Sequence, residues 1–298
     1  MQIFLGNALE GLQGLESDSV SLVVTSPPYP DKRAKSYATC RSREFTSWIL
    51  PISEQIRRVL SPQGSFVLNV KEKVTECERD TYVLETILAL REQGWLWVEE
   101  YIWHKGFCFP GKWRTRFRDA YERCLHFTRS RDFKMRQDAV RVEGRKSTKY
   151  RIRRGSGVPE GRKPSPNAND FAVNEANWTR KKDPHLVYPT NVLSFVPETK
   201  VNHPAPFPLE LPSFFIKLFT DENDLVVDPF LGSGTSAVAA HKLGRRFFGC
   251  EMQMEYQGGI EDRLKTVDSR PDFILGCGHR LLGDSHDDVR SFEQVGSG

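Results

Sequence analysis

The stretch from residue 225 to residue 243 constrains the fold more than any other part of the chain. It begins with Leu225-Val226-Val227-Asp228, a short apolar run that predicts a buried strand. Gly232 and Gly234 follow, and glycine permits the tight turn and the close backbone approach that such a corner needs. The alanine-rich segment Ala237 to Leu243 then predicts a helix. A strand, a glycine turn and a helix in direct succession are typical of a parallel α/β sheet.

The rest of the chain repeats this alternation of strand and helix. Apolar residues spaced as in a helix, from Glu44 to Leu60, precede a short apolar run from Ser65 to Val70. The other predicted segments are strand, helical turn and strand in Ile3 to Tyr29, helix Tyr82 to Gln93, strand Trp95 to Trp103, strand Tyr121 to Thr128 as an antiparallel partner at the sheet edge, a helix up to Phe219, strand Arg246 to Cys250 and helix Gln253 to Lys265. We therefore expect an α/β fold, with a mostly parallel twisted sheet and helices on both faces.

Size and composition fit a single large domain with an insertion. The chain has 298 residues, of which 38% are hydrophobic, so it can bury a substantial core. No apolar run approaches the length of a membrane span, and the first residues lack the plan of a signal peptide. We expect no membrane association and an intracellular location, in the cytoplasm or nucleoid of a bacterium or the nucleus of a eukaryote. The six cysteines show no pairing or metal-ligand spacing, so we expect no metal.

Positive charge is concentrated in one segment, Arg129 to Lys182. This segment holds sixteen Lys or Arg and six Asp or Glu, a local charge of +10 in a chain whose total charge is +4. Such a block attracts a polyanion, because binding to phosphates releases condensed counterions. The glycines and prolines within it also fit a solvated loop. Both descriptions hold if the segment becomes ordered on nucleic acid.

A second corner lies near the amino terminus, where Thr25-Ser26-Pro27-Pro28-Tyr29 directly follows the apolar run Val20 to Val24. Two consecutive prolines end the strand and prevent a helix, because proline has no N–H and its φ is fixed. The loop therefore presents carbonyl oxygens, the Ser26 hydroxyl and the Tyr29 ring without a local N–H partner. Such a surface suits a planar amine, although Pro-Pro pairs also occur in ordinary turns and in polyproline ligands.

Together the two corners resemble those of the DNA amino-methyltransferases. In that family a Ser-Pro-Pro-Tyr loop is catalytic and an Asp-Pro-Phe-x-Gly-Ser-Gly-Thr loop binds the cofactor, and both stand unaltered here at residues 26–29 and 228–235. The catalytic loop comes first, which is the order of the beta class. The resemblance implies a Rossmann-like methyltransferase fold, S-adenosylmethionine as cofactor and DNA as partner. It leaves open a monomer or a homodimer, and whether a cognate restriction endonuclease exists.

The resemblance also implies a set of cofactor-binding residues. Glu251, nineteen residues after Gly232, stands where a carboxylate accepts hydrogen bonds from ribose hydroxyls. His203 and Phe207 resemble the segment that closes over the methionine end, and Asn7 stands where the family often has an aspartate that contacts the adenine amine. The whole predicted set is Asn7, Thr25, His203, Phe207, Asp228, Phe230, Gly232, Ser233, Gly234, Thr235 and Glu251.

Two alternatives come from other classes of protein. One is a dinucleotide-binding dehydrogenase, because Gly232-x-Gly234-x-x-Ala237 also fits the dinucleotide pattern and both cofactors contain adenosine. The Ser-Pro-Pro-Tyr loop and the basic segment favour the methyltransferase. The other is a catalytically silent DNA-binding protein on the same fold, and the two intact loops favour the enzyme over it.

We hypothesise that residues 26–29 hold the exocyclic amine of a base for direct attack on the sulfonium methyl group. Ser26 and the Pro27 carbonyl accept the two amine hydrogens, Tyr29 stacks on the base, and Pro28 completes the catalytic loop. A base inside a duplex is out of reach, so base flipping or a single-stranded substrate follows. By resemblance, serine at the first loop position is associated with cytosine N4, and aspartate or asparagine with adenine N6. We expect cytosine and keep adenine as the alternative.

The predicted organisation has four parts. Residues 1–128 form the catalytic half of the methyltransferase domain, 129–192 the basic target-recognition insertion, 193–268 the cofactor-binding half and 269–298 a polar tail. We expect DNA contacts from the insertion and from the segments beside the base pocket. The predicted DNA-binding residues are Lys105, Arg118, Lys149, Arg151, Arg153 and Arg154.

Overall fold

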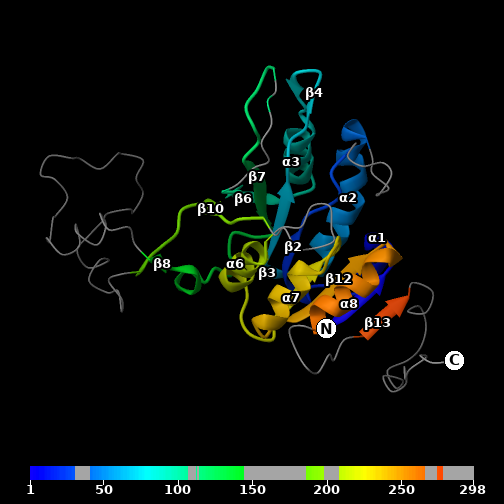
Figure 1. The fold of residues 1–298 in the computed structure, drawn as a ribbon. Coiled ribbons are helices and arrows are strands. Elements are labelled where there is room, and N and C mark those ends of the chain that lie inside the picture. Colours follow the sequence, from blue (N-terminus) through cyan, green and yellow to red (C-terminus); the bar gives the residue numbers. More distant parts are fainter. Residues whose placement is uncertain are drawn as a thin grey trace, which may run out of the picture. The chain divides into compact units, whose positions relative to one another are not determined.

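The computed structural model describes residues 1–30, 41–106, 112, 114–143, 186–197 and 208–265, and the backbone of residues 274–277. The chain divides into two compact units (Figure 1). One unit comprises Met1–Met135 and Asn191–Gly298, and the other comprises Arg136–Thr190. The first unit contains the main sheet and both of the corners described above.

A mostly parallel sheet forms the centre of the first unit. Within the described part of the chain it has nine strands, in the order β10-β6-β7-β3-β2-β11-β12-β1-β13. Neighbouring strands are parallel except where β7 pairs with β3 and with β6. The predicted α/β fold with a mostly parallel sheet is therefore confirmed. The strands are β1 (Gln2–Leu5), β2 (Val20–Thr25), β3 (Leu60–Val70), β6 (Leu96–His104), β7 (Tyr121–Thr128), β10 (Val192–Ser194), β11 (Leu225–Asp228), β12 (Arg246–Glu251) and β13 (Ile274–Cys277).

Strand β7 corrects one prediction, because it lies inside the sheet and not at its edge. Its residues pair with both neighbours, for example Leu125 with Leu68 on β3 and with Glu100 on β6. All of its residues after the first are buried, as expected for a central strand. Since β7 runs antiparallel to these neighbours, its first residues lie level with the carboxyl ends of the parallel strands.

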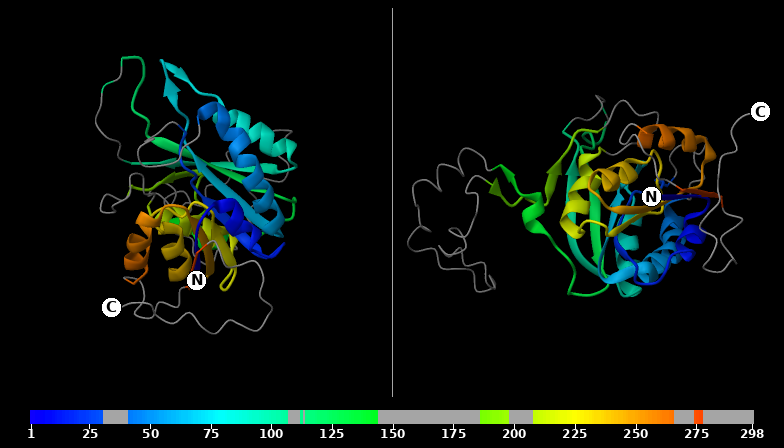
Figure 2. Two further views of the ribbon diagram at one scale, coloured as in Figure 1. Left: turned by 90° about the vertical axis from the view of Figure 1, so that its right-hand side faces the viewer. Right: turned by 90° about the horizontal axis from the view of Figure 1, so that it is seen from below.

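Helices cover both faces of the sheet, with the blue to cyan helices on one side and the yellow to orange helices on the other (Figure 2). Helix α2 shows why a helix packs this way, because its buried residues recur at helical spacing. They are Phe45, Ile49, Ile52, Ile56 and Val59. No helix in the described ranges is long and apolar enough to span a bilayer. The first face carries α1 (Ala8–Gln13), α2 (Ser42–Val59) and α3 (Tyr82–Glu92), and the second carries α6 (Glu210–Phe219), α7 (Thr235–Lys242) and α8 (Gln257–Lys265).

Several short elements fall outside the predicted pattern. The hairpin of β4 (Val74–Thr75) and β5 (Glu78–Arg79) turns at Glu76 and Cys77, which both have positive φ. Strand β13 lies in the segment predicted as a polar tail, and it pairs in parallel with β1. The other short elements are the 3-10 turns η1 (Gln137–Val140) and η2 (Met254–Tyr256), and β8 (Val142–Glu143), which pairs with β9 (Leu186–Val187).

Aromatic rings surround a buried histidine on β7. His126 is 1% exposed, and its ring centroid lies 4.4 Å from that of Phe219 and 5.3 Å from that of Phe133. Its Nε2 lies 3.0 Å from Ser65 Oγ, whereas Nδ1 has no hydrogen-bond partner among the described residues. Burial lowers the pKa of His126 to about 3, so the ring is neutral in the folded protein.

This histidine should make stability depend on pH. Its pKa returns to about 6.5 in the unfolded chain, so between pH 6.5 and 3 the unfolded state binds a proton that the folded state does not. We expect His126 to lower the free energy of unfolding by about 2 kcal/mol at pH 5 relative to neutral pH. Urea unfolding at several pH values measures this difference, and His126→Phe should remove it. Equal pH slopes for the two proteins would contradict the prediction.

The turn between β11 and α7 depends on glycine, because Gly232 and Gly234 both have positive φ. Gly234 has a φ of 81°, and a Cβ added there would lie 3.4 Å from Ile260 Cγ2. Because residues with a Cβ avoid this left-handed conformation, Gly234→Ala should lower the free energy of unfolding by about 1–2 kcal/mol in urea denaturation. Gly259→Ala is the control, because Gly259 lies in α8 and its added Cβ meets nothing within 4 Å. That change should stabilise the protein slightly, and equal losses in both variants would contradict the assignment.

Candidate active site

The two corners meet at one edge of the sheet because β2 and β11 are neighbouring parallel strands. Leu22 pairs with Val226, so the Ser-Pro-Pro-Tyr loop after β2 and the glycine turn after β11 leave the sheet side by side. The Thr25 hydroxyl donates a hydrogen bond to Asp228 Oδ1 at 2.5 Å, which joins the ends of the two strands directly. The carboxyl ends of parallel strands are where open α/β sheets bind their ligands.

Asp228 holds this junction together from inside the protein. The residue is fully buried, and its Oδ2 accepts a hydrogen bond from the Ser236 hydroxyl at 2.5 Å. Its Oδ1 also accepts the Phe230 N–H at 3.1 Å. Burial raises the pKa of the Asp228 carboxyl, and the donated hydrogen bonds oppose that rise. Both oxygens are bonded to protein donors that join β2, the turn after β11 and α7, and the predicted contact between Asp228 and the cofactor stays a prediction.

Glu251 ends β12, the strand beside β11, and its carboxylate reaches the glycine turn. Oε2 accepts the Gly232 N–H and Oε1 accepts the Gln253 N–H, both at 2.8 Å. Burial raises the pKa of this carboxyl too, and the backbone donors oppose the rise. The end of β1 joins the same edge, because the Gly6 N–H donates to the Glu251 carbonyl at 2.9 Å. Each carboxylate oxygen has a further lone pair with which to accept a hydroxyl.

Three more predicted cofactor residues lie at the glycine turn. Ser233 Oγ lies 3.3 Å from Thr235 Oγ1 at the start of α7. Phe230 is half-buried, and its ring centroid lies 5.4 Å from that of Trp48 on α2. The turn therefore combines hydroxyl groups with an aromatic ring.

Asn7 has a local role that the sequence analysis does not predict. Its Oδ1 accepts the Leu9 N–H at 2.8 Å and so caps the first turn of α1. A contact between Asn7 and adenine stays a prediction. His203 and Phe207 lie outside the described residues.

Ser26 and Tyr29 take part in a polar network with side chains from the neighbouring strands β3 and β7. Ser26 Oγ lies 3.4 Å from the Tyr29 hydroxyl. Asn69 on β3 reaches both, with its Nδ2 at 3.3 Å from Ser26 Oγ and 3.4 Å from the Tyr29 oxygen. Pro27 is buried and Pro28 is half-buried, so packing as well as hydrogen bonding holds the loop.

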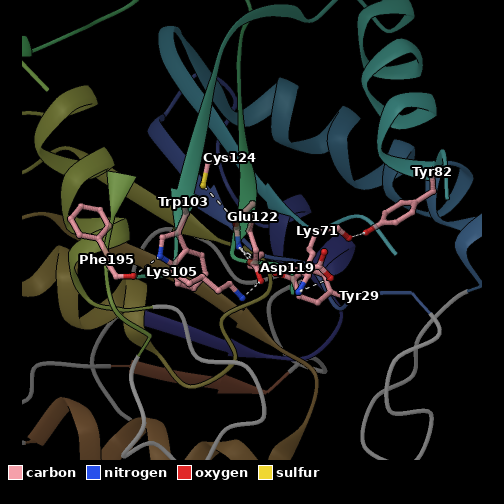
Figure 3. Close-up of polar contacts among 11 residues, drawn as sticks. Tyr29, Lys71, Tyr82, Trp103, Lys105, Asp119, Glu122, Cys124 and Phe195 are labelled. Atoms are coloured by element: carbon pink, nitrogen blue, oxygen red, sulfur yellow. Dashed lines mark hydrogen bonds and ion pairs between the residues drawn. The ribbon is translucent and has the colours of Figure 1, made fainter. Parts of the chain in front are cut away.

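Glu122, the second residue of β7, is the centre of this network (Figure 3). It is 4% exposed, and its Oε2 accepts hydrogen bonds from the Tyr29 hydroxyl at 2.5 Å and from Asn69 at 2.8 Å. Burial, together with the Glu122 charge, raises the pKa of Tyr29 well above its usual value, so the phenol keeps its proton. By resemblance, the sequence places Glu122 in a segment, Phe117 to Glu122, that helps to shape the base pocket, but it assigns no individual role to Glu122 and none to Asn69.

Lys105, predicted as a DNA contact, binds this network. Its Nζ donates to Glu122 Oε1 at 2.6 Å and lies 4.9 Å from the centre of the Trp103 ring. Its backbone N–H donates to the Ala120 carbonyl at 2.8 Å, which joins the two ends of the segment between β6 and β7. This placement favours a role toward the protein, and the phosphate contact stays a prediction. Arg118 is exposed. The other predicted DNA-binding residues lie outside the described ones: Lys149, Arg151, Arg153 and Arg154.

A family model described as DNA methylase, N6_N4_Mtase, matches residues 20–262. The match covers well over half of the chain and includes both corners and the strands between them. The chain therefore belongs to this DNA methylase family. The resemblance inferred from the two loops is confirmed, and the dehydrogenase alternative is set aside.

Individual proteins of this kind are similar along most of their length. The type II methyltransferase M.PvuII of Proteus hauseri is 26% identical over 97% of this chain and 91% of that protein. Among solved structures, the cytosine-N4-specific PvuII DNA methyltransferase has a TM-score of 0.65 and 24% identity, covering 88% of this chain and 85% of its own. TTHA0409 of Thermus thermophilus, a putative DNA modification methylase complexed with S-adenosyl-L-methionine, has a TM-score of 0.61 and 22% identity over 96% and 99%. These structures share the fold of this chain.

The junction of the two corners predicts a specific loss of stability. Thr25→Val keeps the shape of the side chain but removes the hydrogen bond to the buried Asp228 carboxyl. We expect the free energy of unfolding, measured in urea, to fall by about 1–3 kcal/mol. Thr75→Val on β4 is the matched control, because Thr75 is exposed and its change should stay within about 0.5 kcal/mol. Equal effects of the two changes would mean that the Thr25 bond does not hold the corners together.

Proposed function

We propose that the chain is an S-adenosylmethionine-dependent DNA methyltransferase that methylates the exocyclic N4 amine of cytosine. The observation that carries the proposal is the Thr25–Asp228 junction, because it sets the Ser-Pro-Pro-Tyr loop and the glycine turn side by side at one edge of the sheet. Membership of the DNA methylase family supports the substrate. The name of the structurally similar PvuII enzyme, cytosine-N4-specific, supports the target atom.

The residues at the glycine turn fit S-adenosylmethionine by their chemistry. Glu251 has carboxylate oxygens that can accept the ribose hydroxyls, and Gly232 lets the backbone approach the ligand closely. Phe230 offers a half-buried ring to the apolar parts of the ligand. When bound, the cofactor supplies an activated methyl group. The protein contributes its orientation toward the neighbouring loop.

The Ser-Pro-Pro-Tyr loop supplies acceptors for the target amine. Ser26 Oγ and the Pro27 carbonyl each accept one amine hydrogen, and the two prolines offer no N–H that would compete for these oxygens. Holding both hydrogens opposes delocalisation of the nitrogen lone pair into the ring of the base and directs it at the methyl carbon. The Tyr29 ring stacks on the base while its hydroxyl stays on Glu122.

The proposal extends to how DNA is engaged. A paired base cannot reach the loop, so the target cytosine leaves the stack or is already single-stranded. The basic segment 129–192 is the proposed target-recognition region, since its excess of positive charge suits a phosphate backbone. The name of M.PvuII as a type II methyltransferase supports a restriction endonuclease of the same specificity as a partner of this chain too.

Methylation of unmodified genomic DNA tests the proposal. The wild-type protein with labelled S-adenosylmethionine should yield N4-methylcytosine in nucleoside mass spectrometry. Ser26→Ala removes one amine acceptor and should slow methyl transfer by about 100-fold. Ser47→Ala, an exposed serine of α2, is the matched control and should leave the rate unchanged. N6-methyladenine alone would contradict the choice of base, and DNA binding without any methylation would indicate a silent binding protein.

A further inference from the structure

Glu122 lies beside the catalytic loop, and the chemistry proposed above uses it only to hold the Tyr29 hydroxyl. Its two oxygens have different partners (Figure 3). Oε1 accepts from Lys105 Nζ at 2.6 Å, whereas Oε2 accepts from the Tyr29 hydroxyl at 2.5 Å and from Asn69 Nδ2 at 2.8 Å. An ion pair that only stabilised the fold would need Lys105 alone. The second oxygen instead bonds to two groups that both contact Ser26.

The directions of these hydrogen bonds follow from the chemistry of the groups. A lysine ammonium and an amide NH2 can only donate, so the Glu122 carboxylate accepts from both. The Asn69 amide cannot turn over freely, because its Oδ1 accepts the Cys124 thiol hydrogen at 3.3 Å. Burial raises the pKa of Cys124 well above its usual value, which keeps this thiol protonated and able to donate.

These constraints reach the Ser26 hydroxyl. Because the Tyr29 proton is donated to Glu122, the Tyr29 oxygen is left as an acceptor, and the Ser26 O–H donates to it at 3.4 Å. The Asn69 hydrogen that is not donated to Glu122 lies between Ser26 Oγ and the Tyr29 oxygen, with Nδ2 at 3.3 and 3.4 Å from them, so it takes at most one lone pair of Ser26 Oγ. The other lone pair of this oxygen is then the group that Ser26 can offer to an amine hydrogen.

We propose that Glu122 is a positioning residue for methyl transfer, which sets the direction of the hydrogen bonds so that Ser26 presents a lone pair, and not its proton, to the target amine. The inference rests on the proposed function, because it concerns the amine that the loop is proposed to hold. Lys105 takes part by occupying Oε1, so that Oε2 is left for Tyr29 and Asn69.

Glu122→Gln tests this role with almost no change of shape. Lys105 would still take the side-chain oxygen, so the new NH2 group would face Tyr29 and Asn69. The Tyr29 hydroxyl would then turn toward Ser26, whose own proton would point at the amine hydrogens. We expect the single-turnover rate of methyl transfer to fall by about 10- to 100-fold, with the affinity for S-adenosylmethionine unchanged.

Glu100→Gln is the matched control. Glu100 also forms an ion pair between β6 and β7, since it accepts from Arg123 at 2.5 and 2.8 Å, and this pair does not involve the catalytic loop. A structural role for Glu122 predicts similar losses of thermal stability and no loss of rate in folded protein for either variant. We expect the loss of rate for Glu122→Gln alone.

Two double variants keep the test decisive if Glu122→Gln folds poorly. In Lys105→Met with Glu122→Gln, the amide is free to turn its oxygen toward Tyr29 and Asn69, so the rate should exceed that of Lys105→Met with Glu122→Leu by about tenfold or more. Equal rates for this pair, or a Glu122→Gln rate equal to wild type, would overturn the role of Glu122 and leave the proposed function standing. A wild-type protein that transfers no methyl group to DNA would overturn both.

Discussion

A single side-chain contact between neighbouring strands, from Thr25 to Asp228, sets the geometry on which the active site depends. It forms because β2 and β11 run in the same direction and end at the same edge, more than two hundred residues apart along the chain. Asp228 then bonds to Ser236 in α7, so one buried carboxyl fixes the end of a strand, the turn that follows and the helix beyond it. A buried carboxyl is costly to hold unless its oxygens are satisfied by donors, and this arrangement satisfies them with groups that must stay in place for the two loops to face each other.

Much of the fold could be predicted from local pattern. The helix around Phe45 and Ile49 and the strand before Gly232 show the periodicity that burial on a sheet requires, and the structure has them within a few residues of the expected bounds. The position of β7 could not be predicted in this way, because an apolar strand between two neighbours and one at an edge carry the same pattern. The β4–β5 hairpin is unpredictable for another reason: its turn uses Glu76 and Cys77 at positive φ, where glycine or asparagine would have been the recognisable signal.

In the candidate site, too, some residues could be predicted from local pattern, whereas others depend on how the strands pair. Ser26, Tyr29 and Asp228 stand in short motifs whose residue types are unusual enough to notice in the sequence, and Glu251 is found by its spacing after the glycine turn. Glu122 and Asn69 belong to strands β7 and β3, where a polar residue that points into a site cannot be told from one that faces solvent until the pairing of the strands is known. Asn69 on β3 pairs with Cys124 on the neighbouring strand β7, and this register brings Glu122 close to the catalytic loop. Lys105 stands out by its charge, but its partner could not be predicted, since the pair depends on how β6 and β7 lie together.

The backbone hydrogen bond between Lys105 and Ala120 joins the two ends of the connection between β6 and β7. It joins Lys105 just after β6 to Ala120 just before β7, so the two ends of the connection are held beside the Lys105–Glu122 pair. Loops that are anchored at both ends can change length at little thermodynamic cost. A change in the length of this connection would therefore leave the Lys105–Glu122 pair, and the buried acid beside the catalytic loop, in place.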